Sequence, residues 1–315
     1  MRKIVVFSGS AHRELAAEIC TRLRQPLSRT EITRFSNDCL QVQLKANCRE
    51  ADVFIIQPLV PPVQDHLMEL LLMLDAARGA SAARITAVVP HFAYARSDKK
   101  QEPRISIAGR LVADLLAAAG ANRALTMTLH APQVHGFFSV PVDHLNALQV
   151  LSRHFLRRDL RNTVVVSPDF GRAKEAGHFA RLLKLPVAAG SKKRLSDDKV
   201  VIDAIVGDVE GKNAIILDDE IANGGTVIEL LERLRERQVK KIIVVCTHGL
   251  FTGQAIARFK AQPDIAEIVT TNTVPISGEK RLPNMRVLSV APLIAEAIRR
   301  IHVGKSVSAL FGKDV

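Results

Sequence analysis

The chain has 315 residues, enough for two domains with separate cores, and its 47% hydrophobic and 24% charged residues are typical of a globular protein. The net charge of +12 favours polyanionic partners. Aromatic residues make up only 4% and the basic residues are scattered, which disfavours nucleic acid and favours phosphorylated small molecules. No apolar run reaches the ~18 to 20 residues of a membrane span.

Short β-branched runs alternate with longer helical patterns along the chain. The predicted strands are 3–7, 52–56, 85–89, 124–128, 163–166, 214–218, 241–246, 267–270 and 286–289. The predicted helices include 11–24, 66–79, 106–119, 172–184, 226–237 and 291–301. This alternation predicts an α/β fold with mainly parallel sheets flanked by helices.

The pattern runs twice. Residues 115–130 and 233–248 each read as a helix end, a polar corner, a strand and a closing Thr/His, so His248 would be the counterpart of His130. The strands at 85–90 and 214–219 match in the same way. We therefore predict two tandem copies of one α/β unit, an N-terminal domain at 1–145 and a C-terminal domain at 146–315.

The most specific segment, 215–226, reads IILDDEIANGGT. A buried strand brings Asp218 and Asp219 to the carboxyl edge of a sheet, where ligands bind in open α/β folds. The glycines that follow allow backbone N–H groups to approach a phosphate at a helix N-terminus, and Thr226 adds a hydroxyl. An ordinary turn with an N-cap is the alternative, but the acid pair favours a site for a sugar phosphate or a metal.

Three further features are ambiguous by themselves. His130, after a strand, would more often be a structural hydrogen-bonder than a ligand. Asp169, also after a strand, could be a turn or cap residue. The cluster Lys192–Lys193–Arg194 could be a solvated loop.

An ordered series of motifs resembles the ribose-phosphate diphosphokinases, or PRPP synthases, over nearly the whole chain. The motifs are FSGS (7–10), RFSN (34–37), VFIIQP (53–58), RITAVVPHFAYARSD (84–98), TLHAPQVHGFF (128–138), VSPDFG (166–171), GSKKR (190–194), the loop 218–226 and LIAEAIRRIH (293–302). The resemblance implies two phosphoribosyltransferase-like domains. It also implies a cytoplasmic homo-oligomer, hexameric or dimer-based, that moves diphosphate from Mg-ATP to ribose 5-phosphate and releases AMP. The four cysteines, which form no CxxC pair, agree with a reducing compartment.

The resemblance also implies roles for single residues. Lys192 and Arg194 match the cations of the catalytic loop, and His130 and Asp169 match residues at magnesium sites. The ATP site would include Phe35, Asn37, Cys39, Arg96, Ser97 and His130. The ribose 5-phosphate site would comprise Asp218, Asp219, Ala222, Asn223, Gly224, Gly225 and Thr226.

The chain departs from the family pattern at several of these places. Acids are usual where Asn37 and Cys39 stand, and Gln is usual where Ser97 stands. The sugar-phosphate loop has Ala222 and Asn223 in place of Asp and Thr, and Gly171–Arg172 replaces a Gly-Gly pair.

The departures leave a catalytically weak regulatory subunit as the alternative function. Lys192, Arg194, His130 and Asp169 oppose it, because all four are intact. A phosphoribosyltransferase that consumes PRPP is disfavoured by the duplicated domain. The sequence therefore predicts an enzyme with ATP and ribose 5-phosphate as its partners, and neither nucleic acid nor a membrane.

Overall fold

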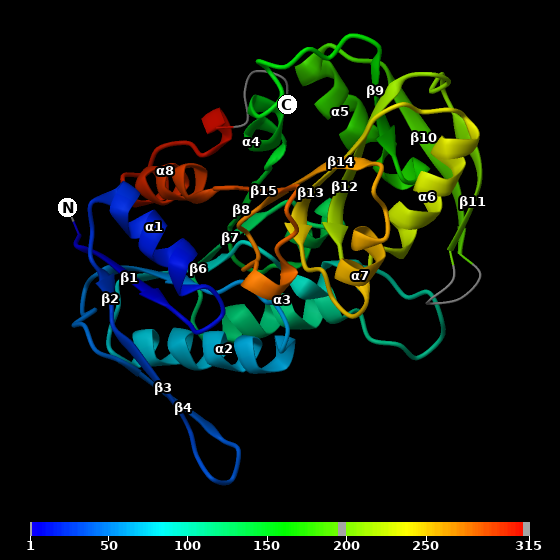
Figure 1. Ribbon diagram of the computed structural model, residues 1–315. Coiled ribbons are helices and arrows are strands. Elements are labelled where there is room, and N and C mark those ends of the chain that lie inside the picture. The colour runs from blue at the N-terminus through cyan, green and yellow to red at the C-terminus, as the bar shows by residue number, and fades with distance from the viewer. Residues whose placement is uncertain (1, 195–199, 311–315) are drawn as a thin grey trace. The chain divides into compact units, whose positions relative to one another are not determined.

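The computed structural model describes residues 2–194 and 200–310, except for the side chains of residues 192–194, 200 and 201. The chain packs into two compact units, which are described separately (Figure 1). The first contains Met1–Asn146, Thr273–Pro275 and Val290–Val315, and the second contains Ala147–Asn272 and Ile276–Ser289. The predicted boundary between the two repeats, at 145/146, stays a prediction. The two compact units do not follow it along the whole chain, because the last helix packs on the first unit.

The first unit is built on a six-stranded parallel sheet in the order β2-β1-β5-β6-β7-β8. Its strands are β1 (Ile4–Ser8), β2 (Leu27–Ser28), β5 (Asp52–Ile56), β6 (Arg84–Val89), β7 (Arg123–Met127) and β8 (Val142–Leu145). Helices α1 (Arg13–Leu23) and α8 (Ala291–His302) cover one face, and α2 (Val63–Gly79) and α3 (Ala108–Ala119) cover the other (Figure 1). Both faces are covered, and accordingly every residue of β5 is buried.

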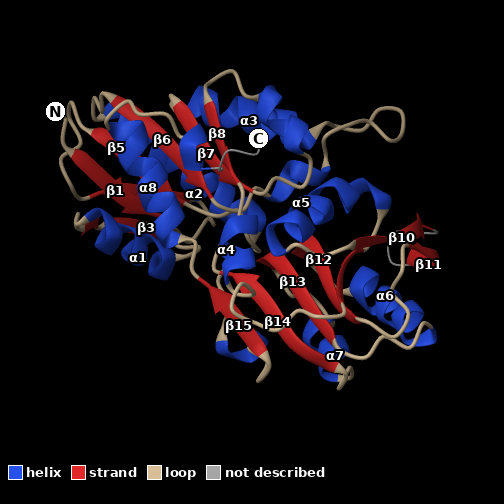
Figure 2. Ribbon diagram, turned by 90° about the horizontal axis from the view of Figure 1, so that it is seen from above, coloured by secondary structure: helices blue, strands red, loops and turns tan. Residues whose placement is uncertain are grey.

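The second unit has a seven-stranded sheet in the order β11-β10-β9-β12-β13-β14-β15, seen from above in Figure 2. Its strands are β9 (Thr163–Ser167), β10 (Val187–Arg194), β11 (Val200–Val206), β12 (Asn213–Ile221), β13 (Ile242–Gly249), β14 (Ile265–Thr271) and β15 (Met285–Leu288). Its helices are α4 (Leu148–Arg153), α5 (Ala173–Leu183), α6 (Gly225–Glu236) and α7 (Ala255–Lys260). Only the β10–β11 pair is antiparallel among the described strands of this sheet.

Smaller elements complete the chain. A separate hairpin pairs β3 (Thr30–Arg34) with β4 (Leu40–Leu44) and extends from the first unit (Figure 1). The short 3-10 helices are η1 (Ala93–Arg96), η2 (Pro132–Phe137), η3 (Phe170–Arg172), η4 (Gly278–Lys280) and η5 (Ser308–Leu310). None of the helices in the described ranges has the length and apolar content that crossing a membrane demands. The two helix-flanked, mainly parallel sheets confirm the predicted α/β class.

The two sheets repeat one topology, but the predicted alignment of the repeats is wrong by one strand. β1 lies between β2 and β5, and β9 lies in the same way between β10 and β12. Therefore β6 corresponds to β13 and β7 to β14, whereas the sequence pattern matched 85–90 with 214–219 and 115–130 with 233–248. His248 is the penultimate residue of β13, so its counterpart lies near the end of β6 and is not His130.

Each sheet contains one point where the direction of the connections reverses. In the first unit the chain leaves β1 for β2 on one side, while β5 and the strands after it continue on the other. In the second unit the same reversal separates β9 from β12. Ligand crevices in open α/β sheets form at the carboxyl ends of such strand pairs.

Helices α4 and α8 follow equivalent strands, β8 and β15, and each packs on the other repeat's unit. On the first unit, Asp52 is 1% exposed and accepts hydrogen bonds from the Arg84 guanidinium, with Nε at 2.9 Å. His302 Nδ1 lies 2.8 Å from Asp52 Oδ2, and Arg84 donates to the Ile301 carbonyl at 2.9 Å. This buried cluster fastens the end of α8 to strands β5 and β6.

We expect Asp52→Ala to lower the free energy of unfolding by about 3 to 5 kcal/mol, because it leaves the partners of a buried carboxylate uncompensated. Urea titration of the intact chain measures the change. The control is Asp75→Ala, which removes a pair with Arg78 whose side chains are 63% and 55% exposed. It should cost less than about 1 kcal/mol. Equal losses in the two variants would contradict the fastening role of Asp52.

Candidate functional site

The end of β9 places Asp169 at the reversal point of the second sheet. Ser167 donates its hydroxyl to the Asp169 carbonyl at 2.7 Å, and Asp169 Oδ1 accepts the Arg172 backbone N–H at 3.1 Å. Asp169 therefore caps η3, as its position after a strand suggested, and its side chain is half-buried. The cap fixes the orientation of the carboxylate.

Both acids lie on β12, whereas the predicted strand included Asp218 but not Asp219. β12 continues to Ile221, because Glu220 pairs with His248 and Ile221 pairs with Gly249 in the parallel ladder. Successive strand residues point to opposite faces, so Asp219 is 3% exposed while Asp218 is only partly buried. The predicted end of this strand at residue 218 was three residues short.

The carboxylates of Asp218 and Asp219 have different surroundings. Asp219 Oδ2 lies 2.6 Å from Arg172 Nη2, and this ion pair is almost completely buried. Asp218 Oδ1 accepts the Asp219 backbone N–H at 2.8 Å. Burial, together with the adjacent negative charge of Asp219, raises the pKa of Asp218 well above its ordinary value, and Arg172 opposes this in part.

The glycine loop connects β12 to α6. Gly224 has φ +77° and α6 begins at Gly225, as expected for a loop that opens a helix. Asn223 Oδ1 accepts the Gly225 N–H at 3.0 Å, which closes a tight turn. The remaining groups at the start of α6 include Thr226, whose hydroxyl is placed at the helix N-terminus. This is the arrangement that binds phosphate in other proteins.

Neighbouring elements hold this loop, and sequence reasoning did not identify them. Thr252 donates its backbone N–H to the Ala222 carbonyl at 2.9 Å. Arg258, on α7, donates to the Asn223 carbonyl at 3.1 Å. Arg258 is also 3.5 Å from the point where a Cβ on Gly225 would lie. Nothing in the local pattern around residues 252–258 distinguishes them from an ordinary loop and helix.

We expect Gly224→Ala to disturb the loop, because its Cβ would lie 2.9 Å from Phe259 Cε2 and its φ is left-handed. The cost in stability should be roughly 1 to 3 kcal/mol, with loss of phosphate-ligand binding. Gly211→Ala is the matched control: Gly211 has φ +64° but open space around its Cβ position. Thermal unfolding and calorimetry with ribose 5-phosphate distinguish the two. Equal behaviour of both variants would show that packing against Phe259 is irrelevant.

His130 lies on the first unit, three residues after β7 ends, and is half-buried. The segment before it is fixed by β8: Thr128 donates to the Leu145 carbonyl at 2.9 Å, and Leu129 donates its N–H to His144 Nε2 at 2.9 Å. Burial, followed by the nearby His135, lowers the pKa of His144 to about 4. His144 thus positions the His130 segment as a neutral acceptor, a role that the sequence did not reveal.

The His144 contact predicts acid sensitivity. The folded-state pKa of about 4 lies below the reference value of 6.5, so the unfolded chain binds more protons between these values and stability falls as pH drops through this window. The loss should reach ~3 kcal/mol at most. His144→Gln keeps an acceptor that does not titrate, and we expect it to flatten this part of the stability curve. Parallel curves for both proteins in urea at pH 4 to 7 would contradict the assignment.

Arg96 and Ser97 lie at the end of η1 in the first unit. Arg96 is exposed. The Ser97 hydroxyl donates to the Ser106 carbonyl at 3.2 Å and accepts the Ala108 N–H at 3.0 Å. Ser97 therefore closes the loop 98–107 and caps α3. Ser97, which replaces the usual Gln, thus makes structural hydrogen bonds within its own unit.

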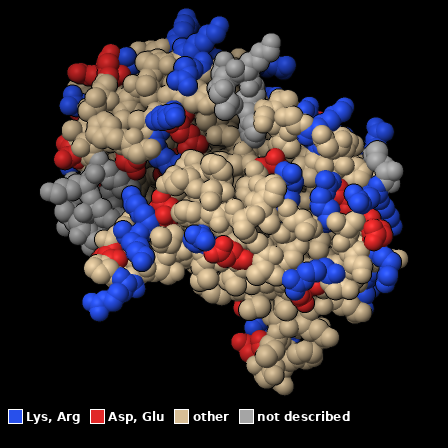
Figure 3. Space-filling model, turned by 180° about the vertical axis from the view of Figure 1, so that it is seen from behind, with Lys and Arg blue, Asp and Glu red and all other residues tan. Residues whose placement is uncertain are grey.

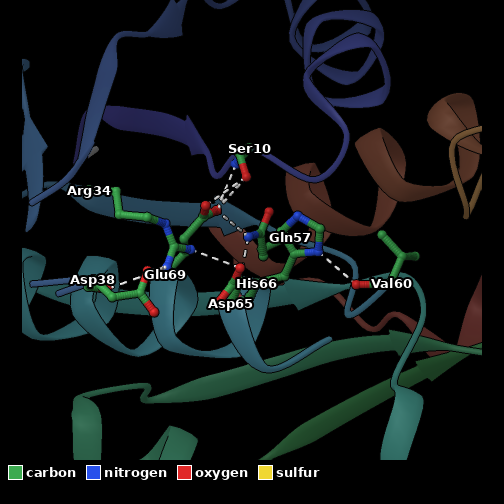
Figure 4. Close-up of polar contacts among 8 residues, drawn as sticks. All are labelled: Ser10, Arg34, Asp38, Gln57, Val60, Asp65, His66 and Glu69. Carbon is green, nitrogen blue, oxygen red and sulfur yellow. Dashed lines mark hydrogen bonds and ion pairs between the residues drawn. The ribbon is translucent and has the colours of Figure 1, made fainter. Parts of the chain in front are cut away.

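Phe35, Asn37 and Cys39 lie together at the tip of the β3–β4 hairpin, and all three are exposed. Asn37 Oδ1 accepts the Cys39 N–H at 3.2 Å, so the amide shapes the turn. Phe35 is 49% exposed and presents an aromatic surface. Arg34 fixes the hairpin to α2 through an ion pair with Asp65 at 2.8 Å (Figure 4).

The reversal point of the first sheet is filled by the chain itself (Figure 4). Glu69 is 6% exposed and accepts the Ser10 N–H at 2.9 Å, the Ser10 hydroxyl at 2.7 Å and Gln57 Nε2 at 2.7 Å. A Cβ on Gly9 would lie 2.4 Å from the Gln57 side chain. Side chains of the first unit therefore fill the position that corresponds to the acid pair and the glycine loop of the second unit.

The structure thus gathers one set of predicted residues, namely Asp169, Asp218, Asp219 and the loop 222–226, at the β9/β12 reversal. The predicted ATP residues all lie on the first unit. Lys192 and Arg194 lie on β10, with side chains outside the described residues. The described residues contain no group of three or more His, Cys, Asp or Glu that could hold a metal by itself.

Comparisons with known proteins agree along the whole chain. Residues 4–120 match the N-terminal domain of ribose phosphate pyrophosphokinase, and residues 192–312 match the phosphoribosyl synthetase-associated domain. A Streptomyces coelicolor protein named provisionally as a ribose-phosphate pyrophosphokinase is 63% identical over 99% of this chain and 98% of its own length. The ribose-phosphate pyrophosphokinase of Deinococcus radiodurans is 51% identical over 98% of both chains.

A solved structure supports the same relation. The crystal structure of phosphoribosylpyrophosphate synthetase from Mycobacterium smegmatis superposes with a TM-score of 0.90 at 39% identity. The match covers 96% of this chain and 100% of that chain. Both units are therefore phosphoribosyltransferase-like, as the resemblance implied.

Proposed function

The chain belongs to the ribose-phosphate pyrophosphokinase family, and from this membership we propose that it transfers the diphosphoryl group of ATP to the anomeric hydroxyl of ribose 5-phosphate. AMP and PRPP are the products. The observation that carries the proposal is the β9/β12 reversal, where an acid pair on β12 precedes a glycine loop at a helix N-terminus. Full-length relatives named as the enzyme favour this function over a regulatory subunit.

The sugar phosphate fits the groups around β12. The loop from Ala222 to Thr226 would hold the 5-phosphate through backbone N–H groups and the positive end of the α6 dipole. Carboxylates accept hydrogen bonds from sugar hydroxyls, and charge-assisted bonds of this kind are the stronger class. The acid pair before the loop would therefore orient the ribose ring and its anomeric oxygen.

Enzymes of this class generally use Mg2+, which would neutralise charge on the ATP phosphates. Magnesium usually takes one or two carboxylates and completes its shell with water and substrate phosphates. A single capped carboxylate, Asp169, suits that requirement. By resemblance we propose His130 as the protein group at the magnesium ion of ATP, and Asp169 as the group at a second ion near the ribose.

ATP would be held by Phe35, Asn37, Cys39, Arg96, Ser97 and His130. Phe35 offers a stacking surface, and Arg96 offers an exposed cation. Lys192 and Arg194 would stabilise the charge that develops on the transferring group, because phosphoryl transfer depends mainly on positioning and electrostatics. The anomeric oxygen attacks the β-phosphorus in line, AMP departs, and no covalent enzyme intermediate is needed.

The location, the oligomeric state and the partners are inferred from membership of the family. We propose a cytoplasmic homo-oligomer, hexameric or dimer-based, without nucleic acid or membrane as a partner. On the face drawn in Figure 3, Lys and Arg side chains lie in small separate groups among acidic ones.

The test is product analysis with purified protein, ATP and Mg2+. We expect AMP and PRPP in equal amounts, formed only when ribose 5-phosphate is present and abolished by chelation of the metal. Asp169→Asn should lower the rate at least about tenfold, since it weakens a metal ligand. Formation of ADP would mean that a single phosphoryl group moves. The absence of any product would favour the regulatory alternative.

A further inference from the structure

One basic side chain connects the two strand ends at the reversal point of the second unit. Arg172 lies in η3, directly after β9, and its backbone N–H reaches Asp169 Oδ1 at 3.1 Å. Its guanidinium places Nη2 2.6 Å from Asp219 Oδ2 and Nη1 3.1 Å from Glu175 Oε2. Arg172 therefore binds the loop after β9, the end of β12 and the first turn of α5 to one another.

The pair with Asp219 is the most desolvated of these contacts. The side chains of Arg172 and Asp219 are 12% and 2% exposed, whereas that of Glu175 is 21% exposed. Removing one partner of a buried ion pair leaves the other charge uncompensated, so the pair is sensitive to the loss of either member. A planar guanidinium also holds a carboxylate in a fixed orientation, which an ammonium group does less well.

This contact gives the two neighbouring acids different tasks. Asp219 is turned into the unit and engaged by Arg172, while Asp218 is only partly buried. Arg172 compensates the buried charge of Asp219, so Asp218 is the more accessible acid of the pair.

We propose that Arg172 is a positioning residue for ribose 5-phosphate: its guanidinium holds Asp219 at the end of β12 and leaves Asp218 as the carboxylate that receives the sugar hydroxyls. The inference rests on the proposed function. It assigns a task to Arg172, which occupies a place where the family pattern has glycine, and it separates two acids that the sequence treated as equivalent.

The first experiment measures the contact without any substrate. Thermal unfolding of the wild type, Arg172→Met, Asp219→Asn and the double variant forms a double-mutant cycle. We expect the double variant to be more stable than the sum of the single losses predicts, because it does not leave the buried Asp219 charge uncompensated. Strict additivity would overturn the proposed pairing, whatever the activity of the protein.

The second experiment measures ribose 5-phosphate affinity by calorimetry and both KM values by AMP release. Arg172→Met should weaken ribose 5-phosphate binding at least about tenfold, with the ATP KM within about threefold of wild type. Arg172→Lys should recover part of the affinity. The control is Glu175→Gln, which removes the more exposed partner and should leave both constants unchanged. An unchanged affinity in Arg172→Met, or an equal rise in both KM values, would overturn the proposal.

A third comparison covers the case in which Arg172→Met fails to fold. Asp218→Asn should lose ribose 5-phosphate affinity with little change in thermal stability, whereas Asp219→Asn should lose stability as well. The reverse order would overturn the division of tasks. A wild-type protein that binds ribose 5-phosphate and responds to these changes but forms no AMP would refute the proposed reaction and leave this inference intact.

Discussion

The site depends on a constraint of parallel sheets. A chain that forms parallel strands must cross over between them, and the crossovers are almost always right-handed. When the chain leaves β9 towards β10 and later continues from β12 in the other direction, the two following loops separate and leave a crevice. Asp169, Arg172, the acid pair and the glycine loop all belong to these two strand ends, so the topology alone assembles residues that are about fifty positions apart in the sequence.

The first unit has the same reversal point as the second, but different side chains lie there. At the β1/β5 reversal, Glu69 on α2 accepts hydrogen bonds from the backbone and hydroxyl groups of Ser10 and from the Gln57 side chain. A buried carboxylate needs such donors, and here the loops after β1 and β5 supply them. The second unit instead places its carboxylates on β12 and opposes one of them with Arg172. Equal topologies therefore place different side chains at the reversal point, an internally hydrogen-bonded carboxylate in the first unit and an acid pair with Arg172 in the second.

Sequence reasoning predicted the α/β class, most strands and the set of residues at the β12 end, because periodicity and the DD-GG-T spacing are local signals. The alignment of the repeats failed by one strand, since neighbouring βα units resemble each other as much as equivalent ones do. The extension of β12 to Ile221 also escaped prediction, because it depends on pairing with His248 and Gly249 on another strand. Arg172 and His144 act through distant partners, Asp219 and Leu129, and such contacts leave no trace in local spacing.

The glycine loop illustrates how a departure from a family pattern can be accommodated. Asn223 Oδ1 occupies the Gly225 N–H, a group that a bound phosphate would use. A neutral hydrogen bond of this kind contributes about 1 kcal/mol, whereas a bond to a charged group contributes about 1.5 to 3 kcal/mol. A phosphate that displaced the Asn223 side chain would therefore gain more than the loop loses. Meanwhile Thr252 and Arg258 hold the carbonyls of Ala222 and Asn223, so the backbone need not rearrange when the amide changes partner. In this way the loop keeps its shape without ligand, and breaking the bond between Asn223 and Gly225 would reduce the affinity for a phosphate by only a modest factor.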